Sequence, residues 1–143
     1  PTIAYGPGQD DSMFLPALIR ALVEGRNFDM SLGEQTRDFV YVDDLVQAII
    51  QALLAPSLCG DVINISSATP IRIDALAKMT ANILGDEADK LLKFGAKDYR
   101  TSDVMQYWAA NTLAKSLLGW SPTVSLEEGV QRTVDYFKAA AVK

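Results

Sequence analysis

The stretch Gly33-Glu34-Gln35-Thr36-Arg37-Asp38-Phe39-Val40-Tyr41-Val42-Asp43-Asp44-Leu45 carries more structural information than any other part of the sequence. Residues 37–42 are rich in aromatic and β-branched side chains, which predicts a strand. Apolar residues follow at helical spacing, so a helix capped by Asp43 or Asp44 is expected to run to about Leu54. The stretch therefore predicts a strand that leads directly into a helix, with an Arg and an Asp at the entrance of the strand.

Helical and strand patterns alternate outward from this stretch. Apolar side chains at helical spacing predict four further helices, at residues 14–23, 73–84, 111–118 and 125–137. The last of these begins with a capping box, in which Ser125 is followed three residues later by Glu128. Alternating or β-branched runs predict short strands at residues 28–32, 62–65 and 91–94. The pattern favours an α/β fold with about five helices and short strands over an all-helical fold.

The composition limits the chemistry that this chain can perform. With 143 residues, of which 49% are hydrophobic and 22% charged, residues 1–143 suit a single domain with a real core. The single Cys, Cys59, and the lack of His exclude an internal disulfide, a Cys/His zinc site and histidine-based nucleophilic or general base catalysis. Catalysis by this chain alone would have to use carboxylates, Lys, Tyr or a borrowed cofactor.

The charge pattern argues against nucleic-acid and membrane partners. The net charge is −5, and the 13 Lys and Arg residues are scattered, so a phosphate backbone would be repelled. The apolar runs are far shorter than the ~20 residues needed to span a bilayer. The first residues lack the basic and apolar regions of a signal peptide, so we expect a cytoplasmic protein.

Five motifs occur in a fixed order along the chain. They are Tyr5-Gly6-Pro7-Gly8-Gln9, Arg37-Asp38-Phe39-Val40-Tyr41-Val42-Asp43-Asp44, Gly60-Asp61-Val62-Ile63-Asn64-Ile65, Leu118-Gly119-Trp120-Ser121-Pro122 and Ser125-Leu126-Glu127-Glu128-Gly129-Val130. Each motif alone is weak, but in this order and spacing they resemble the C-terminal half of an extended short-chain dehydrogenase/reductase. The resemblance is to the NAD-dependent epimerase/dehydratase family, which includes isomerases such as UDP-glucose 4-epimerase, and it covers residue 5 to about 137.

The resemblance implies a substrate-binding half without the cofactor half. In the family, an N-terminal Rossmann domain binds NAD(P) through a glycine-rich turn, and a Tyr with a Lys four residues later carries the catalysis. Here Gly6 and Gly8 are not followed by a third glycine. The residues four positions after the five tyrosines are Gln9, Leu45, Asp103, Asn111 and Ala140. We therefore expect no catalytic, cofactor-binding or metal-binding residue in this chain, which would be inactive alone, and NAD(P) in the full-length protein.

The resemblance also implies two cationic contacts to a nucleoside-diphosphate sugar. Arg37 matches the Arg of the Arg-Asp-Phe/Tyr motif that contacts the diphosphate, and a planar guanidinium can donate two hydrogen bonds to phosphate. Arg100-Thr101-Ser102-Asp103 resembles the Arg-Pro-Gly-Asp motif of the family. Arg100 would then be a second phosphate clamp, and Asp103 would accept from a ribose hydroxyl. A solvated loop cation is the alternative for Arg100.

Four apolar residues match positions that line the nucleotide pocket in the family. Met30 and Leu32 lie on the strand beside the base, Phe39 follows the motif arginine, and Ile71 falls near another base-lining position. Core packing is the alternative for Met30, Leu32 and Phe39. Relatives commonly have Asn where this chain has Ile3, which puts one substrate contact in doubt.

Two other functions stay open. The chain could be a stand-alone binding or interaction module, or part of an extended reductase that acts on a substrate without a nucleotide. Without a cofactor half, the predicted strand at 62–65 would leave an unpaired edge, so we expect the isolated chain to self-associate.

Trp108 and Trp120 are expected to be packing anchors. Surface pairing is the plainest interpretation of Arg37-Asp38.

Overall fold

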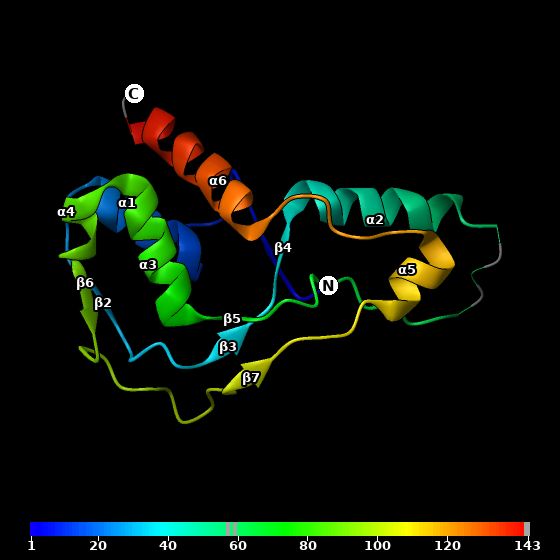
Figure 1. Ribbon diagram of the computed structural model, residues 1–143, viewed down its shortest axis with the longest axis horizontal. Helices are drawn as coiled ribbons and strands as arrows, with labels where there is room; N and C mark the ends of the chain where they lie inside the picture. Colours follow the sequence, from blue (N-terminus) through cyan, green and yellow to red (C-terminus); the bar gives the residue numbers. More distant parts are fainter. Residues whose placement is uncertain (57, 59, 142–143) are drawn as a thin grey trace.

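Two parallel strands bring the Tyr5-Gly6-Pro7-Gly8-Gln9 motif close to the motif that begins at Arg37. A computed structural model describes residues 1–56, 58 and 60–141, and Cys59 lies outside the described residues. Strand β1 (Ile3–Tyr5) pairs with β4 (Phe39–Tyr41), so that Ile3 lies opposite Phe39. Parallel pairing requires a crossover connection, and helix α1 (Phe14–Val23) is part of it (Figure 1).

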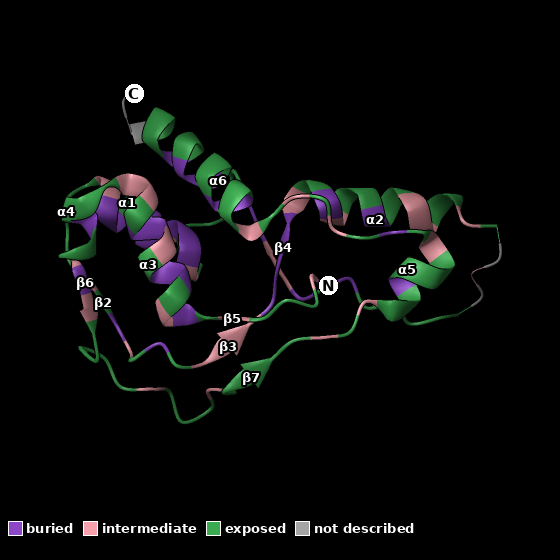
Figure 2. Cartoon of the chain, in the orientation of Figure 1, coloured by how far each residue is buried: buried purple, intermediate pink, exposed green. Residues whose placement is uncertain are grey.

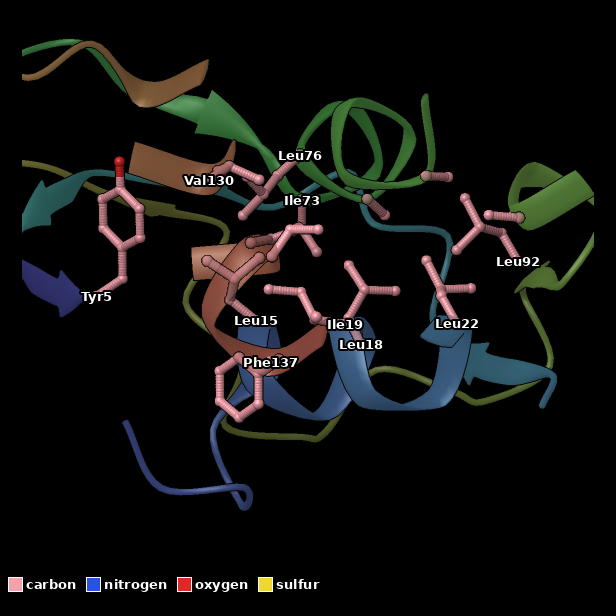
Figure 3. Close-up of a cluster of buried hydrophobic side chains, with 14 of the residues drawn as sticks. Tyr5, Leu15, Leu18, Ile19, Leu22, Ile73, Leu76, Leu92, Val130 and Phe137 are labelled. Carbon is pink, nitrogen blue, oxygen red and sulfur yellow. The ribbon is translucent and has the colours of Figure 1, made fainter. Parts of the chain in front are cut away.

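The larger core lies where three amphipathic helices meet. α1 packs with α3 (Ile73–Leu84) and α6 (Leu126–Ala141), and each presents an apolar face at helical spacing. Figure 3 shows the side chains of this core. The parallel pair of β2 (Phe28–Met30) and β6 (Leu92–Phe94) borders the same core, and the short helix α4 (Asp86–Asp89) follows α3.

A smaller core lies at the other end of the molecule (Figure 1). Helix α2 (Val42–Leu54) packs against α5 (Thr112–Leu118). The buried residues of this core come from both helices and from neighbouring segments, namely Val40 of β4, Ala48, Ile65, Ala114 and Trp120. Figure 2 shows that most of the outer surface of α2 is exposed.

A third, small sheet connects the two ends. It consists of β5 (Ile71–Arg72), β3 (Thr36–Arg37) and β7 (Gln106–Tyr107), with β3 in the centre. β3 pairs antiparallel with β5 and parallel with β7. Two segments far apart in sequence, β5 and β7, therefore lie on either side of Arg37.

The α/β fold and the five predicted helices are confirmed, and α4 is a sixth helix that the periodicity did not indicate. Two strand predictions are wrong. Residues 37–42 do not form one strand, because the chain breaks at Asp38 between β3 and β4. Residues 62–65 form no strand; Val62 is 84% exposed, while the carbonyl of Ile65 accepts a hydrogen bond from the Thr2 amide (2.9 Å).

The N-terminal ends of α2 and α6 differ in how they are capped. Ser125 Oγ accepts a hydrogen bond from the Glu128 amide (3.2 Å), as the capping box predicts. The prediction for α2 is wrong, because Tyr41 occupies the N-cap and makes no side-chain cap. The buried Asp44 instead accepts hydrogen bonds from Thr123 and Val124, far along the chain. None of the helices in the described residues is long and apolar enough to cross a membrane.

Candidate functional site

Arg37 lies at a cavity beside the larger core. The cavity has a volume of about 170 Å³ and is bordered by β1, the turn before α1, the start of α1, the 33–37 stretch, β4 and the start of α3. Its polar lining residues are Gln9, Gln35 and Arg37, and the others are apolar, namely Ile3, Met13, Phe14, Leu15, Phe39 and Ile73. The cavity therefore combines a half-buried cation and two amides with an apolar wall.

The backbone of Arg37 is held from both sides. In the three-stranded sheet, Arg37 lies opposite Ile71 of β5 and opposite Tyr107 of β7. The side chain is half-buried, and its Nη1 donates to the carbonyl of Thr36 (2.8 Å). A guanidinium has five N–H donors, so this bond leaves most of the fork available to an anionic ligand.

Asp38 is a fully buried carboxylate, not a surface partner of Arg37. Its two oxygens accept from Thr2 Oγ1 (3.2 Å), Ser66 Oγ (2.5 Å), Ser67 Oγ (2.7 Å) and the amides of Ser67 (2.9 Å) and Ala68 (3.1 Å). Hydrogen bonds of this kind are what a buried carboxylate requires when no cation faces it. The surface-pair interpretation of Arg37-Asp38 is therefore wrong.

Asp38 also shapes the loop that leads to Ile71. Ala68 has a left-handed φ of 57°, which is uncommon for a residue other than Gly, and its amide donates to Asp38. From there the loop passes through Thr69 into β5. A second cavity of about 510 Å³ lies between this loop and the 122–126 segment, and Phe39 and Ile71 both line it. Phe39 thus lines both cavities.

The predicted residues Arg100 and Asp103 share a surface turn. The Arg100 amide donates to Asp103 Oδ2 (2.9 Å), and the Asp103 amide donates to the Arg100 carbonyl (2.9 Å). Arg100 is exposed and Asp103 half-buried. The segment after this turn enters β7 beside Arg37, which brings the two predicted motifs to the same small sheet.

Met30 and Leu32 have different surroundings. Met30 is buried in the larger core, and its carbonyl accepts from the Lys97 amide (3.2 Å). Leu32 is 54% exposed and lies against Gly95. Neither residue lines the Arg37 cavity, so of the predicted residues only Arg37 and Phe39 meet there.

Gln9 and Gln35 line the cavity, and the sequence analysis did not single them out. The backbone places Gln35 because its carbonyl accepts from the Ile73 amide (3.0 Å) at the start of α3. The neighbouring Gly33 has a φ of 74° and lies so close to Asp74 that a Cβ would come within 2.7 Å of the Asp74 nitrogen. The contacts that place Gln35 are long-range, so no local pattern could have identified it as a cavity residue.

Comparisons with known sequences and solved structures identify proteins that are similar to this chain. Residues 1–66 match the model of the NAD dependent epimerase/dehydratase family. A UDP-glucuronate 4-epimerase of Thermodesulfobacterium geofontis is 32% identical over 136 residues, which cover 94% of this chain and 40% of that protein. The crystal structure of a UDP-glucose 4-epimerase from Thermotoga maritima with UDP-glucose superposes with a TM-score of 0.89 at 33% identity, covering 98% of this chain and 45% of that one.

The chain belongs to the NAD-dependent epimerase/dehydratase family. A UDP-glucuronic acid 4-epimerase from Bacillus cereus, solved with UDP-glucuronic acid and NAD, is equally similar, with a TM-score of 0.89 and 33% identity over 97% of this chain. The chain spans less than half the length of these relatives. It is thus a partial extended short-chain dehydrogenase/reductase.

The family name implies NAD, but the glycine turn of this chain does not fit it. At Gly6 a Cβ would come within 2.6 Å of the Val42 side chain, so the missing side chain makes room for α2 and not for a phosphate. The turn also does not lead directly into a helix, because α1 begins only at Phe14. A pyrophosphate site needs backbone amides at a helix N-terminus right after the glycines.

Tyr5 is not suited to the proton transfer that a catalytic tyrosine performs. Its ring is buried between Phe39 and Tyr41, and its hydroxyl donates to the Leu126 carbonyl (3.3 Å). Burial, followed by the nearby Tyr41, raises the pKa of this hydroxyl above its ordinary value. Among the residues that the structure describes, no group of three or more potential metal ligands occurs.

Proposed function

We propose that this chain is the nucleotide-sugar-binding portion of an NAD(P)-dependent epimerase/dehydratase. The observation that carries the proposal is the position of Arg37, half-buried at a cavity and held between two strands. A diphosphate needs a cation with several directed donors, and an arginine fork supplies them. Arg100 and Asp103 would complete the contact from the turn before β7, with Phe39 at the apolar wall and Ile71 at the neighbouring cavity.

The relatives support a nucleotide sugar as the ligand class. Solved structures at 28–33% identity contain UDP-glucose or UDP-glucuronic acid, some together with NAD. In this proposal NAD(P) binds to a cofactor half that supplies the catalytic Tyr and Lys. The present chain places the sugar by holding the diphosphate and base, which is a contribution of orientation. Alone, it is inactive.

Replacing Arg37 by Ala is expected to weaken binding of UDP about 10- to 100-fold, because charge-assisted hydrogen bonds contribute about 1.5–3 kcal/mol each. Isothermal titration calorimetry of UDP into the chain measures the effect. Arg37→Lys is expected to recover part of the loss, since the charge returns without the planar fork. Arg26→Ala is the matched control, because Arg26 is exposed and pairs only locally, with Glu24.

The same titration tests the alternatives. If the wild-type chain binds none of UDP, CDP, GDP and dTDP, the nucleotide-sugar proposal is wrong, and a reductase of a substrate without a nucleotide becomes the better explanation. Binding that Arg37→Ala leaves unchanged would place the nucleotide elsewhere on the chain.

We also propose that the isolated chain self-associates through α2. The outward face of α2 carries exposed apolar side chains at helical spacing, here called the α2 stripe, which comprises Val46, Ile49, Ile50, Leu53 and Leu54. Leu53 is 79% exposed. A contiguous apolar face of this kind is normally covered by another element or a partner, so the α2 stripe needs a cover. In a longer protein a cofactor half could supply it, and in the isolated chain a second copy does. Residues 62–65 form no strand, so an open strand edge there does not contribute to the self-association.

Sedimentation velocity is expected to show a concentration-dependent dimer. Introducing charge with Ile49→Glu and Leu53→Glu together should shift the chain to monomer, because two carboxylates cannot be buried against an apolar partner. Val104→Glu, at an exposed apolar residue outside α2, should leave the dimer intact. A wild-type monomer at every concentration would rule out the proposed contact.

A further inference from the structure

Asp38 lies between two residues of the candidate site. Arg37 and Phe39 precede and follow it in sequence, and both line the Arg37 cavity. Asp38 itself is fully buried, and the chain breaks at this residue between β3 and β4. The direction in which the Arg37 side chain leaves the backbone therefore depends on how Asp38 is held.

Asp38 is held through both its backbone and its side chain. Its carbonyl accepts a hydrogen bond from the amide of Ile3 (3.0 Å), a residue that also lines the cavity. Its carboxylate accepts from Thr2, next to β1, and from the 66–68 loop. Hydrogen bonds to a charged acceptor are shorter and stronger than those between neutral groups. Segments that are distant in sequence are thus fixed at one carboxylate.

The 66–68 loop also leads to Arg37 from its other side. The loop turns at Ala68, whose left-handed φ of 57° is sparsely populated by residues that have a side chain. The Ala68 amide donates to Asp38 (3.1 Å), which secures this turn. The chain then continues into β5, where Ile71 lies opposite Arg37. Asp38 therefore supports the backbone of Arg37 twice, through the peptide bond and through β5.

The charge of Asp38 by itself does not favour an anionic ligand at Arg37. A carboxylate repels a phosphate, and the ion pairs among the described residues do not include Asp38. An asparagine would remove this repulsion, but only one of its two terminal side-chain atoms accepts hydrogen bonds. Both oxygens of Asp38 receive donors, which suits a carboxylate and not an amide. The hydrogen bonds, and not the charge, are therefore what this residue contributes.

We propose that Asp38 is a positioning residue for the diphosphate contact: its carboxylate fixes the 66–68 loop and the start of β4, so that the Arg37 guanidinium is directed to the cavity. This inference rests on the proposed function, because it takes a diphosphate as the ligand of Arg37. Asp38 itself does not touch the ligand. It raises affinity through Arg37, because a rigid support lowers the entropic cost of ordering the guanidinium on binding.

Calorimetric titration of UDP into the chain distinguishes positioning from charge. Asp38→Asn is expected to weaken UDP binding about 5- to 10-fold, the effect of losing one net hydrogen bond between Arg37 and phosphate. Charge alone predicts a change of the opposite sign, since the variant removes a negative charge beside an anion. Affinity that is unchanged or higher in Asp38→Asn would overturn the proposal.

Thr2→Val is a second variant, which keeps the charge of Asp38. It preserves the shape of the side chain and removes one donor to the carboxylate, so UDP binding should weaken about 2- to 3-fold. If Asp38→Asn does not fold, Thr2→Val decides the test, and an unchanged affinity in this variant would then contradict the proposal.

Leu22→Ala is the matched control for loss of stability. Leu22 is buried in the larger core, at the opposite end of α1 from the cavity, so its truncation destabilises the chain without touching Arg37 or Asp38. The folded variant should bind UDP as the wild type does. An equal loss of affinity in Leu22→Ala would mean that any loss of stability weakens binding, and Asp38 would have no special role.

Nuclear magnetic resonance measures the support of Arg37 without any ligand. The Nε–H group of Arg37 is expected to become less ordered on the picosecond-to-nanosecond timescale in Asp38→Asn and to stay unchanged in Leu22→Ala. The Nε–H group of the exposed Arg26 should be the same in all three proteins. If the wild-type chain binds no UDP, the proposed function fails, and this measurement still decides the role of Asp38. Equal order of Arg37 in the wild type and Asp38→Asn would overturn that role.

Discussion

Replacing Asp38 by Ala is expected to lower the free energy of unfolding by about 3–5 kcal/mol, because several buried donors lose their acceptor together. The hydroxyls of Thr2, Ser66 and Ser67 and the amides of Ser67 and Ala68 all donate to this one carboxylate. The loss of stability is thus larger than that of an ordinary surface substitution.

Urea denaturation followed by circular dichroism measures this effect. Asp38→Asn is a second, more conservative variant. It keeps the shape of the side chain but replaces one carboxylate oxygen with an amide nitrogen, which faces hydrogen-bond donors. We expect it to lose at least half as much stability as Asp38→Ala. Asp135→Ala, at an exposed position on α6, should change the free energy of unfolding by less than about 0.5 kcal/mol. If Asp38→Ala lowered the free energy of unfolding as little as Asp135→Ala, the carboxylate of Asp38 would not hold the 66–69 loop.

The second large effect is expected at Trp120. Its side chain is 2% exposed, packs in the smaller core, and donates from Nε1 to the carbonyl of Asp44 (2.9 Å). Trp120→Ala should cost about 3–5 kcal/mol, the usual range for a buried aromatic residue. Trp120→Phe should cost less, since part of the ring volume remains and the main loss is the hydrogen bond.

Trp108 is the natural control for this experiment. Both tryptophans were expected to be packing anchors, but Trp108 is 56% exposed, so for this residue the prediction is wrong. Trp108→Ala is expected to change the unfolding free energy by less than about 0.5 kcal/mol. Fluorescence should also separate the two, because the emission that remains in Trp108→Ala comes from the buried Trp120 and lies at shorter wavelength. Equal losses for the two residues would contradict the assignment of Trp120 to the core.

Local sequence signals account for the described helices except α4. The apolar spacing from Phe14 to Val23 and from Ile73 to Leu84 matches α1 and α3 residue for residue. Gly119 ends α5 in a left-handed conformation (φ 66°), as a glycine after a helix does. These features depend on neighbours within one or two turns of chain, so the sequence contains all the information that they require.

The roles of the acidic residues depend on distant partners. Asp44 follows a strand and looks like a helix cap, yet its carboxylate accepts from Thr123 and Val124, about eighty residues away in sequence. Asp38 looks like the ion-pair partner of Arg37, yet its carboxylate accepts hydrogen bonds from the 66–68 loop. A carboxylate can serve as a cap, an ion-pair partner or a buried acceptor, and only the path of the chain determines which donors reach it.

The candidate site divides in the same way. The sequence by itself determined the family, the α/β class, and the importance of Arg37 through an ordered set of motifs. Tertiary structure alone decided that Phe39 shares a cavity with Arg37 while Met30 lies in the core, and that the carboxylate of Asp38 accepts from two distant segments of the chain. The physical reason is range: capping and periodicity act over a few residues, whereas the cavity is closed by segments that only the folded chain brings together.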